Sequence, residues 1–132
     1  MATAFEPVFD ALKALLKEHA TVLAVQSDSA QVYSLAGRVP SPFPQHKGNP
    51  MWFGSARMGK AYASFHLMPV YAFPDLRDSL SPQLRRRMQG KSCFNFTRVD
   101  EALFVELELL TARGIERFRE LGVRRESMGR RA

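Results

Sequence analysis

The stretch on which the predicted fold depends is Met88-Gln89-Gly90-Lys91-Ser92-Cys93-Phe94-Asn95-Phe96, and its glycine separates the preceding arginine-rich residues 85–87 from the aromatic Phe94 and Phe96. Before it, Ser81-Pro82 is typical of a helix start and predicts a short helix from Pro82 to Gln89, with Gly90 as its C-terminal cap. After it, we expect a strand from Lys91 to Arg98. Alternation places Phe94 and Phe96 on one face of this strand. The other face then carries Lys91, Cys93, Asn95 and Thr97.

Hydrophobic periodicity on both sides of this stretch predicts an α+β domain. Helical spacing indicates helices at residues 4–19 and from Asp100 to about Leu121. Period-two alternation and turn residues indicate two hairpins, with strands at 21–25, 31–37, 51–58 and 60–68. Residues 70–74 are expected to be extended. Because hairpins favour antiparallel pairing, we expect a mainly antiparallel sheet of about five strands with N-terminal and C-terminal helices packed on it, in the order α-β-β-β-β-α-β-α.

Length and composition are those of one ordinary globular domain. The chain has 132 residues, 45% of them hydrophobic, and no apolar run reaches the roughly 18 residues that span a membrane. The N-terminus lacks the basic flank and apolar region of a secretory signal, and the single cysteine excludes an internal disulfide, so we expect a cytoplasmic protein. Half of the net charge of +6 lies in residues 124–132, which show no apolar pattern. We therefore expect a domain at 1–123 and a basic, disordered tail at 124–132.

One face of the predicted sheet combines aromatic and polar side chains, which indicates a small-molecule pocket. Alternation in residues 60–68 places Tyr62, Ser64 and His66 on the face opposite to the apolar Phe65. Aromatic walls with a few convergent polar groups are what small-molecule sites need. The alternative is that these residues fill a second small core under the proline-rich loop at 40–50. Under the pocket hypothesis, the ligand-binding residues are Trp52, Tyr62, His66, Tyr71, Lys91, Cys93 and Asn95.

Catalytic and metal-binding patterns are weak in this sequence. Cys93, Asn95 and His66 are the residue types of a thiol-protease-like set, but such a set also needs a base within reach of the thiol and a lowered thiol pKa. A lone cysteine in an aromatic strand is usually a small buried side chain. One cysteine and three separated histidines lack the paired spacing of a zinc site. We therefore expect a non-catalytic binding module without cofactor or metal, present as a monomer or homodimer.

Clustered arginines support a second hypothesis, which is weak nucleic-acid binding. The clusters are Arg85, Arg86 and Arg87 in the short helix, and Arg124 and Arg125 near the C-terminus. Phosphate contacts need only a basic surface of this kind. Neither a recognition helix nor an aromatic RNA-binding motif accompanies the arginines, so this hypothesis predicts non-specific binding.

Three segments together resemble the YdhG-like family of bacterial proteins, a domain of unknown function. The segments are Tyr62 to Tyr71 (YASFHLMPVY), Ser81-Pro82, and Arg87 to Phe96 (RMQGKSCFNF), and the resemblance covers about residues 51–118. It implies a small α+β fold with an antiparallel sheet and flanking helices. Part of that family is linked to frataxin-like iron handling, which the resemblance adds as an alternative function. Iron donors are hard oxygens and imidazoles, and the nearest acidic cluster in this chain is Asp100-Glu101 with Glu106 and Glu108.

Overall fold

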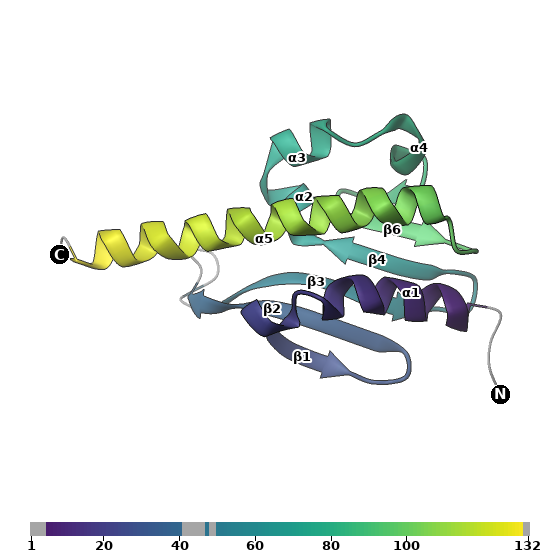
Figure 1. Cartoon of the computed structure of the whole chain (residues 1–132), viewed down its shortest axis with the longest axis horizontal. Helices are drawn as coiled ribbons and strands as arrows, with labels where there is room; N and C mark the ends of the chain where they lie inside the picture. Colours follow the sequence, from purple (N-terminus) through teal and green to yellow (C-terminus); the bar gives the residue numbers. More distant parts are fainter. Residues whose placement is uncertain (1–4, 41–46, 48–49, 131–132) are drawn as a thin grey trace.

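The computed structural model describes residues 5–40, 47 and 50–130, and it confirms the predicted α+β class. Six strands form one antiparallel sheet in the order β1-β2-β3-β4-β6-β5 (Figure 1). The strands are β1 (Ala24–Asp28), β2 (Val32–Pro40), β3 (Pro50–Met58), β4 (Ala63–Leu67), β5 (Met88–Gln89) and β6 (Cys93–Phe96). Both predicted hairpins are present, since β1 pairs with β2 and β3 pairs with β4. The first strand was wrongly predicted at 21–25, because residues 20–22 form a 3₁₀ turn and pairing with β2 begins only at Ala24.

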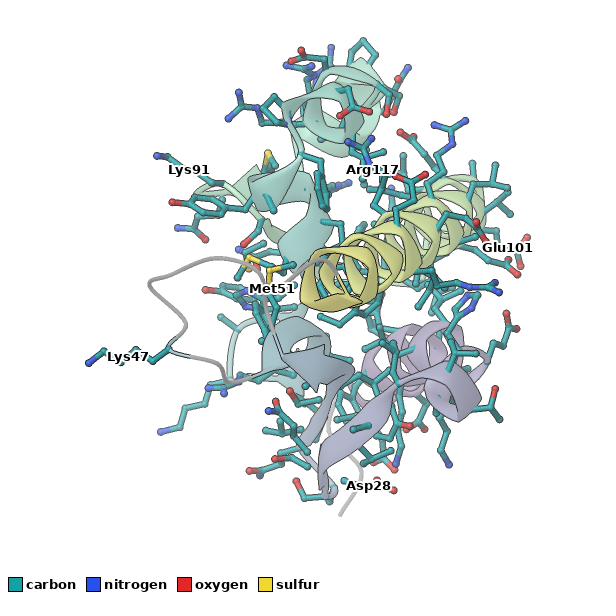
Figure 2. The ribbon with its side chains drawn as sticks, turned by 90° about the vertical axis from the view of Figure 1, so that its left-hand side faces the viewer. Asp28, Lys47, Met51, Lys91, Glu101 and Arg117 are labelled. Atoms are coloured by element: carbon teal, nitrogen blue, oxygen red, sulfur yellow. The ribbon has the colours of Figure 1, made fainter. Side chains whose placement is uncertain are left out.

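The two long helices lie on the same face of the sheet. Helices α1 (Glu6–Lys17) and α5 (Glu101–Arg130) both cover this face, whereas Lys47 and Lys91 project on the opposite side (Figure 2). The remaining helices are short, and they are η1 (Ala20–Val22), α2 (Met68–Ala72), α3 (Pro74–Asp78) and α4 (Pro82–Arg85). In the part of the chain that the structure describes, no helix has the length and apolar character needed to cross a membrane.

The core lies between the sheet and the two long helices. The alternation predicted for residues 60–68 is confirmed, because Phe65 and Leu67 are fully buried while His66 between them is only half-buried. Strand pairing places Phe65 opposite Phe94, so the apolar face continues from β4 to β6. Burial of each large apolar side chain contributes roughly 1.5–3 kcal/mol. The largest fully buried side chains are Tyr33, Phe53, Phe65, Phe94, Phe96, Leu12, Leu16, Leu35, Leu67, Leu84, Leu107 and Val70.

The short helix that leads into residues 88–96 begins as predicted but ends early. The Oγ of Ser81 accepts a hydrogen bond from the backbone N–H of Leu84 at 3.1 Å, which caps α4. The carboxylate of Glu106 in α5 accepts two more bonds from Ser81, at 2.8 Å from the backbone nitrogen and 2.5 Å from Oγ. These contacts fix the start of α4 against α5. The helix nevertheless ends at Arg85 instead of continuing to Gln89.

Met88 and Gln89 form strand β5 rather than the last turn of a helix, so that part of the prediction is wrong. They pair with Phe94 and Cys93 of β6. Gly90 has a φ of 76°, and its left-handed conformation turns this hairpin instead of capping a helix. Each buried backbone group needs a partner, and here the ladder with β6 supplies the bonds that a longer helix would have made.

Residues 70–72 are helical, although we expected an extended segment. The backbone N–H of Phe73 donates to the carbonyl oxygen of Pro69 at 2.9 Å, which closes a turn of α2. Pro69 stands in the first turn of α2, where the missing amide hydrogen is not needed. Pro74 likewise stands in the first turn of a helix, because it begins α3.

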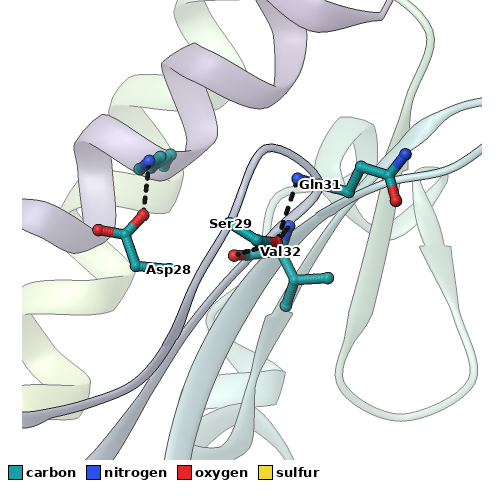
Figure 3. A network of polar contacts seen from close by, with 5 residues as sticks. Asp28, Ser29, Gln31 and Val32 are labelled. Atoms are coloured by element: carbon teal, nitrogen blue, oxygen red, sulfur yellow. Dashed lines mark hydrogen bonds and ion pairs between the residues drawn. The ribbon is translucent and has the colours of Figure 1, made fainter.

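An ion pair fixes the first hairpin against α1. The Nζ of Lys13 lies 2.8 Å from Oδ1 of Asp28 (Figure 3), and this hydrogen bond holds the pKa of Asp28 below its ordinary value. In the adjoining turn, the Oγ of Ser29 accepts hydrogen bonds from the backbone nitrogens of Gln31 at 3.3 Å and Val32 at 3.1 Å. Such short-range bonds from serine favour a tight turn. We expected the turn at Ser27-Asp28-Ser29, but of these only Ser29 lies in it, because Ser27 and Asp28 are the last residues of β1.

Helix α5 begins as predicted and continues further than expected. The side chain of Asp100 accepts a hydrogen bond from the backbone N–H of Leu103 at 3.1 Å, which is an N-terminal cap. The helix extends to Arg130 instead of ending near Leu121. The domain boundary predicted at residue 123 therefore falls inside α5.

Candidate functional site

Side chains of β4, β5 and β6 on the face away from α1 and α5 form a hydrogen-bond network centred on Asn95. Its Oδ1 accepts a hydrogen bond from Oγ of Ser64 at 3.0 Å and another from Sγ of Cys93 at 3.3 Å. Its Nδ2 donates to Oε1 of Gln89 at 2.5 Å. Ser64 and Asn95 are directly opposite each other in the β4–β6 ladder. With both acceptor positions of its oxygen in use, the Asn95 amide has a fixed orientation.

An open recess surrounds this network, and we call it the polar recess. Its volume is about 610 Å³, which lies within the range of small-molecule sites. The turn between β3 and β4 forms one side of it, and β5 and β6 form the other. The lining residues are Arg57, Gly59, Lys60, Ala61, Tyr62, Ser64, His66, Gln89, Cys93 and Asn95. Four of the seven predicted pocket residues, namely Tyr62, His66, Cys93 and Asn95, therefore meet in one place.

Trp52 adjoins the polar recess without lining it. Its ring centre lies 5.9 Å from that of His66, with the two rings tilted by 56°. Its indole nitrogen donates to Oγ of Ser34 at 2.9 Å, which fixes the indole over β2. The indole of Trp52 therefore packs against the imidazole of His66, while its one polar atom is hydrogen-bonded to Ser34.

Tyr71 and Lys91 lie together but outside the polar recess. The Nζ of Lys91 is 5.6 Å from the ring centre of Tyr71, a cation–π arrangement. Both side chains are exposed, and neither lines the recess. The seven predicted residues therefore form two groups, with Trp52 joined to the first through His66.

His66 and Cys93 in the polar recess both favour their neutral forms. Burial lowers the pKa of His66 below its ordinary value of 6.5, and the positive charge of Arg57 lowers it further. Burial raises the pKa of the Cys93 thiol, an effect that a hydrogen bond with Ser64 partly offsets. His66 and Cys93 are opposite each other in the ladder. An activated nucleophile needs a lowered thiol pKa, so these two residues do not have the electrostatics of a thiolate–imidazolium pair.

Substitution of His66 by glutamine is expected to reduce the sensitivity of folding to acid. Because the folded-state pKa of His66 is lowered, the unfolded chain binds this proton more readily. The wild-type protein should keep its full stability above pH 6.5 and lose part of it as the pH falls through the lower folded-state pKa. Melting temperatures of both proteins between about pH 7.5 and pH 5 test this. An equal decline in the two proteins would contradict the assignment.

Four polar side chains that line the recess were not among the predicted ligand-binding residues, although alternation had already placed Ser64 on this face. They are Arg57, Lys60, Ser64 and Gln89. Arg57 is directly opposite Ser64 in the β3–β4 ladder, with the turn at Gly59 between the strands. Assigning that register from the sequence would have placed Arg57 beside the polar face. Gln89 could not be found in this way, because its strand was predicted to be helical.

The backbone places the two arginine clusters in different parts of the fold. Residues 85–87 follow the start of α4, which contacts α5 at Glu106, whereas residues 124–125 lie near the far end of α5 (Figure 1). At about 1.5 Å per residue, roughly 27 Å of helix separates Glu106 from the second cluster. The guanidinium of Arg85 donates to the backbone carbonyl oxygens of Arg77 in α3, at 3.1 Å, and of Leu80 after it, at 3.5 Å, and so stabilises the local fold.

Acidic and other metal-binding side chains are dispersed over the described residues. Within residues 5–40, 47 and 50–130, no three histidine, cysteine, aspartate or glutamate side chains gather closely enough to hold a metal ion. Glu106, from the acidic cluster considered above, has both carboxylate oxygens bonded to Ser81. The described part of the chain therefore offers no specific support for the iron-handling alternative.

Comparisons of the chain with protein-family models, with curated proteins and with solved structures found no match. Membership of the YdhG-like family therefore stays a prediction from the three sequence segments.

Proposed function

We propose that this protein is a binding module that holds a small molecule in the polar recess. The observation that carries the proposal is the network on Asn95, which fixes polar groups from three strands around one recess. A site of this kind is organised before the ligand arrives, which reduces the entropy lost on binding. Tyr62, 38% exposed, supplies an aromatic surface at the same recess.

Binding without catalysis agrees best with the electrostatics of the site. The raised pKa of Cys93 keeps the thiol protonated, and the lowered pKa of His66 keeps the imidazole neutral near pH 7. These groups are suited to hydrogen bonding with a ligand rather than to nucleophilic attack. As in the sequence analysis, we place this binding module in the cytoplasm.

Filling the polar recess is expected to abolish binding. Ala61 is exposed at the recess, so Ala61→Trp adds an indole there without changing the core, and Ala102→Trp adds the same group to an exposed position of α5. Native mass spectrometry of each variant, isolated from the cells that make the protein, should show a retained small molecule with Ala102→Trp and the wild type only. Equal retention by Ala61→Trp would contradict the proposed site.

A further inference from the structure

The polar recess has cationic groups and no carboxylate. Arg57 comes from β3 and Lys60 from the following turn, and neither aspartate nor glutamate lines the recess. The lack of acidic side chains extends to the surrounding sequence, because residues 29–74 and 79–99 contain neither aspartate nor glutamate. The acidic residues belong to the helices α1, α3 and α5 or to the residues next to them, apart from Asp28 at the end of β1. The strands that form the recess therefore lie in a positive field.

Among the described residues, no acidic side chain is paired with Arg57 or Lys60. The side chains of Arg57 and Lys60 form no ion pair or hydrogen bond with another residue that the structure describes, and both are exposed. By contrast, Lys13 is paired with Asp28 and Arg117 with Asp75. Arg57 also acts on the recess itself, because its charge lowers the pKa of His66.

The groups of Asn95 and Gln89 that remain available for further hydrogen bonds are mainly donors. Both acceptor positions on Oδ1 of Asn95 are occupied by Ser64 and Cys93. Its Nδ2 has a second hydrogen beyond the bond to Gln89, and the Nε2 of Gln89 has two more, because Oε1 is the atom that Asn95 contacts. A ligand that satisfies these groups must bring acceptors.

We infer that the polar recess recognises an anion, namely a carboxylate or phosphate group on a small ligand, which Arg57 and Lys60 bind at the β3–β4 turn while the amides of Asn95 and Gln89 donate to it. Guanidinium and amide donors match the planar or tetrahedral oxygens of such groups. Tyr62 lies at the same turn and offers its ring to the body of the ligand. This inference rests on the proposed function and adds the chemical class of its ligand.

A charge series on one aromatic scaffold tests the inference. Benzoate, phenyl phosphate, neutral benzamide and cationic benzylamine are titrated into ¹⁵N-labelled protein, and the side-chain amide resonances of Asn95 and Gln89 report on the recess. We expect an anionic probe to bind about tenfold more tightly than benzamide, as one charge-assisted interaction allows. Comparison of benzoate with phenyl phosphate shows which oxyanion the recess prefers.

Variants that remove one positive charge each identify the side chains that bind the anionic probe. Arg57→Gln and Lys60→Gln should each weaken the anionic probe about fivefold, as a partly exposed ion pair does, whereas Lys17→Gln on exposed α1 should leave its affinity unchanged. Benzamide binding as tightly as benzoate would overturn the anion inference and leave the small-molecule site standing. Equal weakening by Lys17→Gln would also overturn it, because binding would then follow net charge. If no probe of any charge shifts the recess resonances, the inference fails, and a bare native mass in addition would overturn the proposed function.

Discussion

Replacement of Gly54 by alanine is expected to destabilise the protein by about 3 kcal/mol, at the upper end of the usual cost of overpacking. Gly54 lies in β3 opposite Leu67 of β4. A Cβ at position 54 would lie 2.6 Å from the carbonyl oxygen of His66. That oxygen belongs to the backbone of the neighbouring strand, so the clash can be relieved only if β3 and β4 move apart. The same movement would displace His66 and widen the polar recess.

Thermal unfolding measures this effect against a matched glycine in the adjacent strand. For a domain of this size, about 3 kcal/mol corresponds to a fall in Tm of roughly 10 °C. Gly37 in β2 is the control, because an added Cβ would lie 3.4 Å from the carbonyl oxygen of Met51, which is an ordinary contact. Gly37→Ala should change the stability by less than about 0.5 kcal/mol. A similar loss of stability in Gly54→Ala and Gly37→Ala would contradict the predicted clash between residue 54 and the carbonyl oxygen of His66.

Replacement of Gly114 by alanine is expected to destabilise the protein by about 1–2 kcal/mol, although alanine favours a helix by about 1 kcal/mol. Gly114 is buried in α5 where the helix crosses α2 and β3. An added Cβ would lie 2.8 Å from Cγ of Pro69 and 3.4 Å from Cε1 of Phe53. The proline ring is rigid, so it cannot turn away as a flexible side chain would.

A double-mutant cycle separates this clash from helix propensity. In the Pro69→Ala background the nearest atom, Cγ, is gone and only Cβ remains, 3.1 Å from the added methyl. Gly114→Ala should then cost clearly less stability than it does in the wild type, because helix propensity offsets more of the remaining contact. Denaturant unfolding of the four proteins gives the coupling between the two sites. Destabilisation of equal size in both backgrounds would mean that the proline is not the group in conflict with the added methyl.

Alternation and capping residues predicted most of the fold because the local sequence and the final environment agree there. Phe65 and Leu67 alternate with His66 as a half-buried strand should, and Asp100 caps α5. The failure at Met88 and Gln89 has a different origin, since their partners Phe94 and Cys93 lie beyond the turn at Gly90. Helical spacing from Leu84 predicted a helix, but pairing across the turn at Gly90 determined the structure instead.

Alternation within single strands predicted which residues of the candidate site share a face, but not how the strands pair. Alternation placed His66, Cys93 and Asn95 on one face, and the ladder between β4 and β6 confirmed that they meet. It could not separate Tyr71 and Lys91 from that group, because α2 and the β5–β6 turn carry them away from the strands. Nor could it supply Arg57, whose place depends on the register of β3 against β4.

A crystal structure of the protein isolated from the cells that make it, without added ligand, would show whether the polar recess holds a small molecule. We predict density for a small molecule in the polar recess, within hydrogen-bond distance of Asn95 or Gln89 and beside Arg57. A recess filled instead by protein, whether the chain's own residues or those of a second copy, would contradict the account. The network on Asn95 would then belong to a packed interface rather than to a ligand site.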